Sequence, residues 1–269
     1  MPHRWAMEDM RRAKQLATDS RPRGIFITGT DTGVGKTLVT SALVVCLVQR
    51  GIDVGVMKPI ETGVPRSSEA QSDGAWLQKA AGSHDPMAEV CPYVFRLPVA
   101  PLSAARAEGT TVRVATIMRV FRALRQKHDL VVAEGIGGVH VPITSSLNVS
   151  DLIYRMKLPV IVVGRTGLGG INHALLTLHA LRRRKIPIVA LVLNQRQPVQ
   201  MKTARVQEQS TLSLLRRLAG VPVLGPLPYS PIMNRNWDEG LVRLAGTAPI
   251  TKLARLVLAF GRGTLSRRD

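Results

Sequence analysis

Cysteine is scarce in this sequence, with only Cys46 and Cys91 among 269 residues. Two cysteines are too few for a disulfide framework, which fits the reducing conditions of a cytoplasm. Long apolar runs are also missing: the longest nearly uninterrupted one, residues 38–48, is far shorter than the roughly 20 residues of a membrane-spanning helix. We therefore expect a soluble, cytoplasmic protein with no membrane partner.

Acidic residues are outnumbered, because 18 Asp and Glu stand against 37 Lys and Arg, which gives a net charge of +19. Such a balance is typical of nucleic-acid-binding proteins. However, aromatic residues make up only 4% and leave little surface for base stacking. The basic residues also form short separate groups, such as 182–185 and 216–217, mostly where helices should end. We expect a solvated basic surface, with attraction of an anionic substrate as the alternative, and no nucleic-acid partner.

Residues 29–37 read Gly-Thr-Asp-Thr-Gly-Val-Gly-Lys-Thr, a loop of the phosphate-binding type. In the usual loop, four residues separate the outer glycine from Gly-Lys-Ser/Thr; backbone N–H groups surround phosphates, the lysine reaches the outer phosphates and the hydroxyl binds Mg²⁺. This loop has one residue more, and Thr30 stands where the usual pattern has glycine. An apolar run at 25–27 precedes it and helical spacing follows at 38–48. A chance turn is the alternative, but these flanks favour a nucleotide triphosphate site.

Short β-branched runs alternate with segments of helical periodicity along the whole chain. The strand candidates are residues 24–28, 53–58, 129–134, 158–163, 187–194 and 221–224. Nearly continuous apolar strands separated by helices predict an α/β fold, a single P-loop NTPase-like domain with a mostly parallel central sheet and helices on both faces. In such a sheet, ligands bind at the carboxyl ends of the strands.

The periodic pattern marks residues 24–261 as the P-loop domain, with a basic extension at 1–23 and a basic tail at 262–269. The extension lacks an apolar core, so it does not resemble a secretory signal. We expect it to form an amphipathic helix.

Two side chains at predicted strand ends suit a metal ion. Glu134 closes the apolar run 130–133 and is followed by Gly135. A carboxylate in that place is costly unless it is paired or bound to a metal, so a structural salt bridge is the alternative. Thr37 supplies the hydroxyl of the phosphate loop. Together they predict hard oxygen ligands for Mg²⁺.

Lys58 follows another apolar strand and is fixed by Pro59. This arrangement would aim its ammonium into the cleft, although a solvated lysine is an equal alternative. Thr62, next to the flexible Gly63, is placed to donate to a bound substrate.

A series of motifs, in this order, resembles the dethiobiotin synthetase family. They are Gly-Thr-Asp-Thr-Gly-Val-Gly-Lys-Thr at 29–37, Lys-Pro-Ile-Glu-Thr-Gly at 58–63, Ser-Asp at 72–73, Pro-Tyr-Val-Phe at 92–95, Ala-Pro-Leu-Ser-Ala-Ala at 100–105, Glu-Gly-Ile-Gly-Gly at 134–138 and Gly-Leu-Gly-Gly-Ile-Asn-His at 167–173. The resemblance covers roughly residues 24–230, and the elongated phosphate loop is its most specific element.

The resemblance implies an ATP-dependent ligase of biotin biosynthesis, a homodimer that converts 7,8-diaminopelargonate and CO₂ (or bicarbonate) into dethiobiotin, ADP and phosphate. In that family a substrate amine captures CO₂ as a carbamate. The carbamate oxygen attacks the γ-phosphate, and the second amine closes the mixed anhydride to a cyclic urea. The protein contributes mainly positioning and charge neutralisation.

The resemblance also assigns residues by matching motif. Lys36 and Lys58 would be the catalytic cations that neutralise the carbamate and the transferring phosphate. The Mg²⁺ ligands would be Thr37, Asp73 and Glu134. The ATP-binding residues would be Gly33, Val34, Gly35, Lys36, Thr37, Leu38, Asp73, Glu134, Gly135, Ile136, Gly137, Asn194, Pro228, Tyr229 and Ser230. The substrate-binding residues would be Thr32, Thr62, Gly169, Gly170, Ile171 and Asn172, the last four receiving the carboxylate tail across a dimer interface.

This chain departs from the family pattern at three places. Ile136 replaces a commonly smaller residue, Arg235 stands near the position of an acidic nucleotide contact, and 206–209 lacks the partner-subunit aromatic of some members. His173 and His179, on the helix after the last motif, have no further ligands at zinc spacing and should pack in the core or an interface.

Two other classes share this style of loop. A partition-type dimeric ATPase, in which the net charge of +19 would serve DNA or membrane contact, usually has a second lysine early in the loop, where this chain has residues 30–32 without one. An amide-forming synthetase of the cobyrinate type normally adds a glutaminase domain, for which we expect no room after residue 230.

Overall fold

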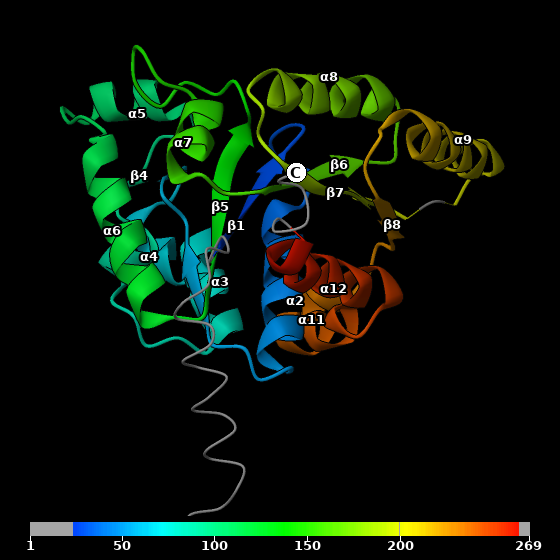
Figure 1. The fold of residues 1–269 in the computed structure, drawn as a ribbon, viewed down its shortest axis with the longest axis horizontal. Helices are drawn as coiled ribbons and strands as arrows, with labels where there is room; N and C mark the ends of the chain where they lie inside the picture. The colour runs from blue at the N-terminus through cyan, green and yellow to red at the C-terminus, as the bar shows by residue number, and fades with distance from the viewer. Residues whose placement is uncertain (1–23, 199, 264–269) are drawn as a thin grey trace, which may run out of the picture.

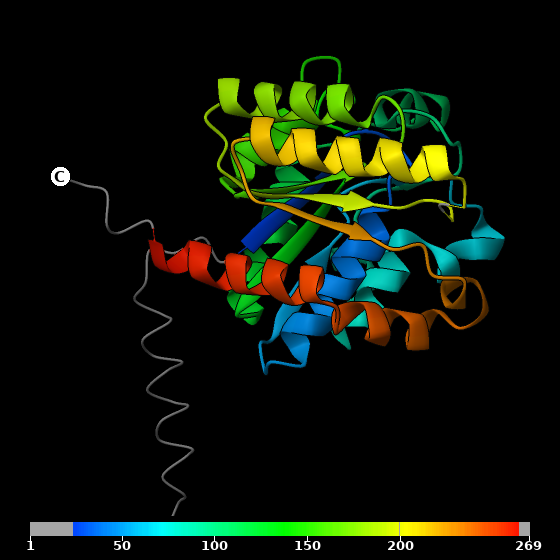
Figure 2. The ribbon, with the colours of Figure 1, turned by 90° about the vertical axis from the view of Figure 1, so that its right-hand side faces the viewer.

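The computed structural model describes residues 24–198 and 200–263. Six strands form one parallel sheet in the order β2-β5-β1-β6-β7-β8 (Figures 1 and 2), which confirms the predicted α/β fold. The strands are β1 Gly24–Gly29, β2 Val54–Met57, β5 Leu130–Gly138, β6 Val160–Arg165, β7 Ile188–Asn194 and β8 Val223–Leu227.

Helices cover both faces of this sheet (Figure 2). Helices α5 to α9 pack on one face, and α2, α3, α11 and α12 pack on the other. The helices are α2 Lys36–Val48, η1 Arg66–Gln71, α3 Asp73–Ala81, α4 Met87–Val90, α5 Pro101–Ala107, α6 Val114–Lys127, α7 Val149–Met156, α8 Gly170–Arg183, α9 Lys202–Leu218, α10 Ile232–Arg235, α11 Trp237–Ala245 and α12 Ala248–Gly263.

The central strand shows why the strands read as unbroken apolar runs. In β1, Phe26 packs into the core under α5 to α9, while Ile25 and Ile27 pack into the core under α2. Successive side chains of a strand point to opposite faces, so a strand covered on both sides must be apolar at every position. The phosphate loop therefore leaves β1 from between the two cores.

The order of strands places the loop at a change of direction in the sheet. From β1 the chain crosses to β2 and β5 on one side, and it then adds β6, β7 and β8 on the other. Ligands of open parallel sheets bind outside the strand ends at such a point.

Three local features differ from the expectation. Glu134, expected to close its strand, lies inside β5, which continues because Gly138 pairs with Gly29 of β1. Strand β8 runs to Leu227, where it still pairs with Asn194. A second, two-stranded parallel sheet joins β3 Glu61–Thr62 to β4 Val94–Phe95. Strands of two residues are too short to show a period in the sequence.

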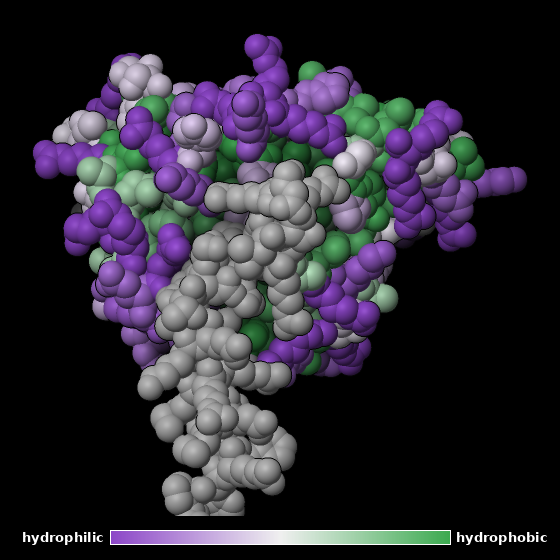
Figure 3. Space-filling model, viewed as in Figure 1, coloured by the Kyte–Doolittle hydropathy of each residue, from purple (hydrophilic) through white to green (hydrophobic). Residues whose placement is uncertain are grey.

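The basic groups lie where the sequence suggested. Arg182 and Arg183 are in the last turn of α8, and Arg216 and Arg217 are in the last turn of α9. On the face seen in Figure 3, hydrophilic side chains form separate groups interrupted by apolar ones. Within the described residues, no helix has the length and apolar character needed to cross a bilayer. The helix expected in the N-terminal extension and the end of the basic tail lie outside the described residues.

A charged cluster fastens the loop before α4 to the sheet. His128 Nδ1 lies 2.9 Å from Asp53 Oδ1, and His128 Nε2 lies 2.8 Å from Asp85 Oδ2. Lys127 adds ion pairs to Glu89 at 2.5 Å and to Asp85 at 3.4 Å. Burial would lower the pKa of His128, but hydrogen bonds to Asp53 and Asp85 outweigh burial and raise it. Below this raised pKa both ring nitrogens donate, as an imidazolium does.

Because the pKa of His128 is raised by folding, its contribution to stability is complete below the unfolded pKa of about 6.5 and is lost as pH rises through the folded pKa. His128→Gln should lower Tm by about 2 °C at pH 5.5, since partly exposed pairs contribute up to about 1 kcal/mol, and by less at pH 9. Thermal unfolding at both pH values measures this, with His84→Gln as an exposed control. A deficit that grows toward pH 9 would contradict the assignment.

Candidate active site

The phosphate loop leaves the end of β1 and enters α2 at Lys36. Gly33 and Gly35 adopt positive φ angles of 68° and 96°. Gly35 occupies the N-cap position of α2 and offers no side chain to the first N–H groups of the helix. These N–H groups, with the positive end of the helix dipole, form an anion site. The predicted phosphate site is therefore present as strand, loop and helix N-terminus.

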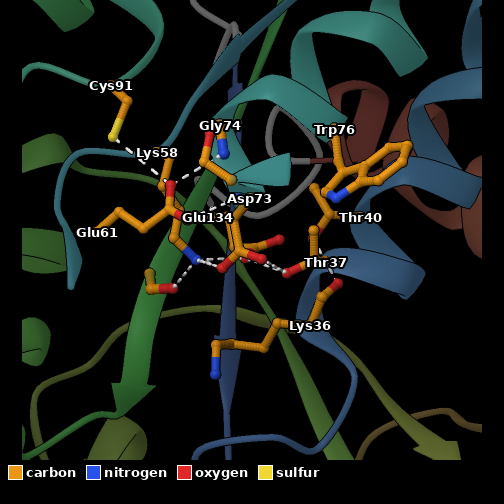
Figure 4. A network of polar contacts seen from close by, with 12 residues as sticks. Lys36, Thr37, Thr40, Lys58, Glu61, Asp73, Gly74, Trp76, Cys91 and Glu134 are labelled. Carbon is orange, nitrogen blue, oxygen red and sulfur yellow. Dashed lines mark hydrogen bonds and ion pairs between the residues drawn. The ribbon is translucent and has the colours of Figure 1, made fainter. Parts of the chain in front are cut away.

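A buried charge network lies beside this loop (Figure 4). Lys58 Nζ is 2.6 Å from Glu134 Oε1 and 2.6 Å from Asp73 Oδ2. Thr37 Oγ1 lies 2.8 Å from Asp73 Oδ1 and 3.0 Å from Glu134 Oε1, and its single proton can be donated to one of them at a time. Four residues distant in sequence therefore meet, and Lys58 is not the solvated lysine of the alternative.

Burial sets the charge states of this network. Lys58 is 2% exposed and Glu134 is 0% exposed. Burial alone would lower the pKa of Lys58, but the Glu134 and Asp73 carboxylates outweigh it and raise the pKa far above its usual value. Burial would raise the pKa of Asp73, yet the Lys58 ammonium lowers it. Lys58 is thus a permanent cation and Asp73 a carboxylate at neutral pH.

Lys36 is the second cation of the site. Burial and the nearby Lys58 ammonium lower its pKa, against the opposing effect of Glu134 and Asp73. Its Nζ lies 3.3 Å from the carbonyl oxygen of Asp31, within the loop. A nucleotide phosphate would supply the anion that this lysine needs.

The oxygen atoms around Thr37 suit a magnesium ion. Glu134 Oε2 is buried without a hydrogen-bond partner in the described part of the chain. Among the same residues, no group of three or more His, Cys, Asp or Glu side chains could hold a metal on its own. Mg²⁺ is commonly held by one or two carboxylates together with substrate phosphates and waters. The hydroxyl of Thr37 and the carboxylates of Asp73 and Glu134 fit that pattern.

The network opens into a pocket of about 510 Å³. Its polar side contains Lys36, Lys58 and Asp73. Its apolar side is formed by residues 98–101, by residues 136–137 of β5 and by the side chain of Val141. The lining residues are Thr32, Gly33, Gly35, Lys36, Thr37, Lys58, Glu61, Thr62, Asp73, Pro98, Val99, Ala100, Pro101, Ile136, Gly137 and Val141. Such a pocket can hold a ligand with a polar end and an alkyl chain next to a nucleotide.

Some predicted residues lie near this pocket without lining it. Asn194, at the end of β7, donates from Nδ2 to the carbonyl oxygen of Val34 at 3.1 Å, so it supports the loop. Leu38 lies in the first turn of α2. Gly135, in β5, accepts a 3.3 Å hydrogen bond from Lys58 Nζ through its carbonyl oxygen.

The segment 228–230 directly follows β8. Tyr229 N donates to Gln195 Oε1 at 3.0 Å, which ties this segment to the residue after Asn194. Two of the segments expected to bind ATP are therefore neighbours.

The start of α8 does not line the first pocket. Gly169 is its N-cap, and Gly170, Ile171 and Asn172 form the first turn. Farther along α8, His173, Leu176 and Thr177 line a second hollow of about 650 Å³, and Val141 lines both hollows. The two spaces adjoin, and Thr30 and Asp31 of the phosphate loop line the second one together with His173, whereas residues 169–172 line neither hollow.

Sequence reasoning missed two parts of the site. Glu61, in the motif 58–63, had no assigned role although it lines the pocket and is 6% exposed. The apolar wall at 98–101 was also missed. Glu61 lies in the motif at 58–63 and Ala100 and Pro101 lie in the motif at 100–105, both quoted without a chemical reason for each residue, whereas residues 98–99 lie outside the quoted motifs.

Three comparisons with known proteins agree with this geometry. The model of a family described as an AAA domain matches residues 23–236. The ATP-dependent dethiobiotin synthetase BioD of Anaeromyxobacter dehalogenans (strain 2CP-C) is 42% identical over 213 residues, which cover 79% of this chain and 93% of that relative. The protein of the same name from Thermodesulfovibrio yellowstonii is 40% identical over 222 residues, covering 79% and 91%.

Among solved structures, the MinD cell division protein of Aquifex aeolicus has a TM-score of 0.50 at 13% identity, over 92% of this chain and 98% of that one. At that identity the likeness shows only the shared fold. The sequence relatives are matched at far higher identity and over nearly their whole length. The chain belongs to the ATP-dependent dethiobiotin synthetase family.

Proposed function

We infer that this family member closes 7,8-diaminopelargonate with CO₂ to dethiobiotin at the expense of ATP, and we propose how its residues do so. The observation that carries the proposal is the buried Lys58, paired with Glu134 and Asp73 at the edge of the phosphate loop. A carbamate, an anionic nucleophile that must approach an anionic phosphate, needs fixed cations at that place. A partition-type switch has no specific observation in its favour.

The reaction begins when one amine of the diamine takes up CO₂ and loses a proton to give a carbamate. A carbamate oxygen attacks the γ-phosphorus and ADP leaves. The second amine then attacks the carbamate carbon and loses a proton, and phosphate leaves with the oxygen that had joined carbon to phosphorus. Atoms and charges balance with ATP as the only activating reagent. The site lowers the barriers mainly by holding the reactants in line and neutralising them.

Each side chain has a proposed part in this sequence. Lys36 and Lys58 neutralise the carbamate and the transferring phosphate. Thr32 and Thr62 contact the diamine or its carbamate. Thr37, Asp73 and Glu134 would hold Mg²⁺, which would neutralise charge on the β- and γ-phosphates when bound. The ATP-binding residues are proposed to be Gly33, Val34, Gly35, Lys36, Thr37, Leu38, Asp73, Glu134, Gly135, Ile136, Gly137, Asn194, Pro228, Tyr229 and Ser230.

The alkyl tail of the diamine is proposed to leave the first pocket past Val141, toward α8. Leu168 and Leu176, before and within α8, are 78% and 58% exposed. We propose that the protein is a cytoplasmic homodimer in which a partner subunit covers these side chains. The first turn of α8 in one subunit, Gly169–Asn172, would then contact the tail of the diamine bound to the other subunit. Light scattering of the purified protein measures the dimer directly.

The function is tested by phosphate release from purified protein with ATP and Mg²⁺. We expect release only when 7,8-diaminopelargonate and bicarbonate are both present, with dethiobiotin formed in equal amount. Omitting either should reduce release to background, because no carbamate forms. Release that is indifferent to the diamine would reject the assignment.

A further inference from the structure

Helix α3 presents the carboxylate of Asp73 from its first residue, and its start is capped from two directions. Ser72, the N-cap, accepts a hydrogen bond from the N–H of Ala75 at 3.1 Å. The N–H groups of Asp73 and Gly74 point elsewhere. They donate to Glu61 Oε1 at 2.6 Å and Glu61 Oε2 at 3.0 Å (Figure 4). One carboxylate from a distant segment therefore binds both N–H groups of the first turn that Ser72 leaves free.

Glu61 is itself held firmly. It lies in β3, its backbone N–H donates to the carbonyl oxygen of Tyr93 at 2.8 Å, and its side chain is 6% exposed. Cys91 also packs on this helix start, where a Cβ added at Gly74 would lie a tight 3.1 Å from Cys91 Cβ and in ordinary contact with Glu61 Oε2, at 3.6 Å. Glu61 is thus packed against the helix start and is not a swinging surface carboxylate.

The same short segment holds Asp73 in two ways. Lys58 binds the Asp73 side chain through Oδ2, at 2.6 Å, and Thr37 contacts Oδ1 at 2.8 Å. Three residues after Lys58, Glu61 binds the Asp73 backbone. A carboxylate at a helix N-terminus is also favoured by the helix dipole. The segment 58–61 therefore contacts both the side chain and the main chain of Asp73.

We propose that Glu61 is a positioning residue that fixes the direction of the Asp73 carboxylate, and with it the affinity of the site for Mg²⁺. The inference rests on the proposed function, because Asp73 is a proposed magnesium ligand. Groups that orient metal ligands commonly change metal affinity by about 10- to 100-fold when they are removed. Glu61 also lines the pocket, so a direct role in binding a substrate amine would appear as a rise in the KM for the diamine.

The test compares wild type with Glu61→Gln and Glu61→Ala. Binding of a non-hydrolysable ATP analogue is measured by calorimetry, first in EDTA and then across a Mg²⁺ series. We expect Glu61→Ala to raise the Mg²⁺ concentration of half-maximal effect by about 10- to 100-fold while binding in EDTA stays within about twofold. Glu61→Gln keeps one acceptor oxygen and should shift it less. Kinetics should show the same shift in Mg²⁺ requirement with the KM for the diamine unchanged.

The matched control is Asn148→Ala, which removes the N-cap of α7 and its hydrogen bond from Asp151 N at 3.1 Å. It should lower thermal stability as a lost cap does, with no change in the Mg²⁺ response. If Glu61→Ala does not fold, Glu61→Gln decides the question. An unchanged Mg²⁺ response in a folded Glu61 variant, or a rise confined to the KM for the diamine, overturns the positioning role alone. A wild-type protein indifferent to Mg²⁺ overturns the magnesium site as well.

Discussion

Lys58→Gln should reduce turnover by about 10²- to 10³-fold while nucleotide binding changes little. The substitution removes a buried cation from the place where charge develops, and losses of single stabilising groups in enzymes have that size. The phosphate loop and Lys36 remain to bind ATP. Turnover is measured by dethiobiotin formation at saturating substrates, and nucleotide binding by calorimetry.

The matched control for that substitution is Lys79→Gln. Lys79 also pairs with a carboxylate, Asp238 at 2.7 Å, but both side chains are more than half exposed. Exposed pairs contribute up to about 1 kcal/mol, so this variant should have wild-type turnover. Unchanged turnover in Lys58→Gln would remove Lys58 from the mechanism. A loss of nucleotide binding equal to the loss of turnover would make Lys58 a binding residue only.

Gly35→Ala should abolish nucleotide binding and lower Tm by about 6–12 °C. Gly35 has a φ angle of 96°, which residues other than glycine rarely adopt. A Cβ there would also overlap the amide nitrogen of Asn194, which holds the loop through the carbonyl oxygen of Val34. Backbone strain and overpacking together cost about 3 kcal/mol, and 1 kcal/mol corresponds to about 2–4 °C in a chain of this size.

Gly82→Ala separates backbone strain from overpacking, the two causes of the expected loss in Gly35→Ala. Gly82 has φ of 59° at the end of α3, with no heavy atom within 4 Å of an added Cβ. It should show only the strain, about 1 kcal/mol, and bind nucleotide normally. Thermal unfolding and calorimetry with ATP measure both variants. Normal ATP binding by Gly35→Ala would mean that the loop is less tightly built than this structure indicates.

Much of the site could be predicted because its functional residues follow apolar runs that are recognisable in the sequence. The phosphate loop, Lys58 and Glu134 each adjoin an apolar run, and parallel strands bring the ends of such runs to one edge. The prediction that Glu134 ends its strand was wrong, because pairing between Gly138 and Gly29 extends β5 past it. Pairing partners of that kind are distant in sequence and leave no local period.

The contact of Glu61 with the first turn of α3 could not be read from the sequence for a related reason. The Asp73 backbone N–H donates to the side-chain carboxylate of Glu61 across a short irregular segment, 63–72, which has no strand or long helix. Any acceptor of the right length could cap that helix. Only the folded geometry shows which one does.

The most direct test of carbamate phosphorylation follows one oxygen atom. The reaction is run briefly in ordinary water with ATP, the diamine and freshly dissolved ¹⁸O-labelled bicarbonate, so that little label exchanges with solvent. Because phosphate leaves with the carbamate oxygen, we predict one ¹⁸O atom in the released phosphate and label in the dethiobiotin carbonyl. Phosphate without label, and carrying ¹⁸O instead when the water is labelled, would mean that water attacks ATP and would contradict the account.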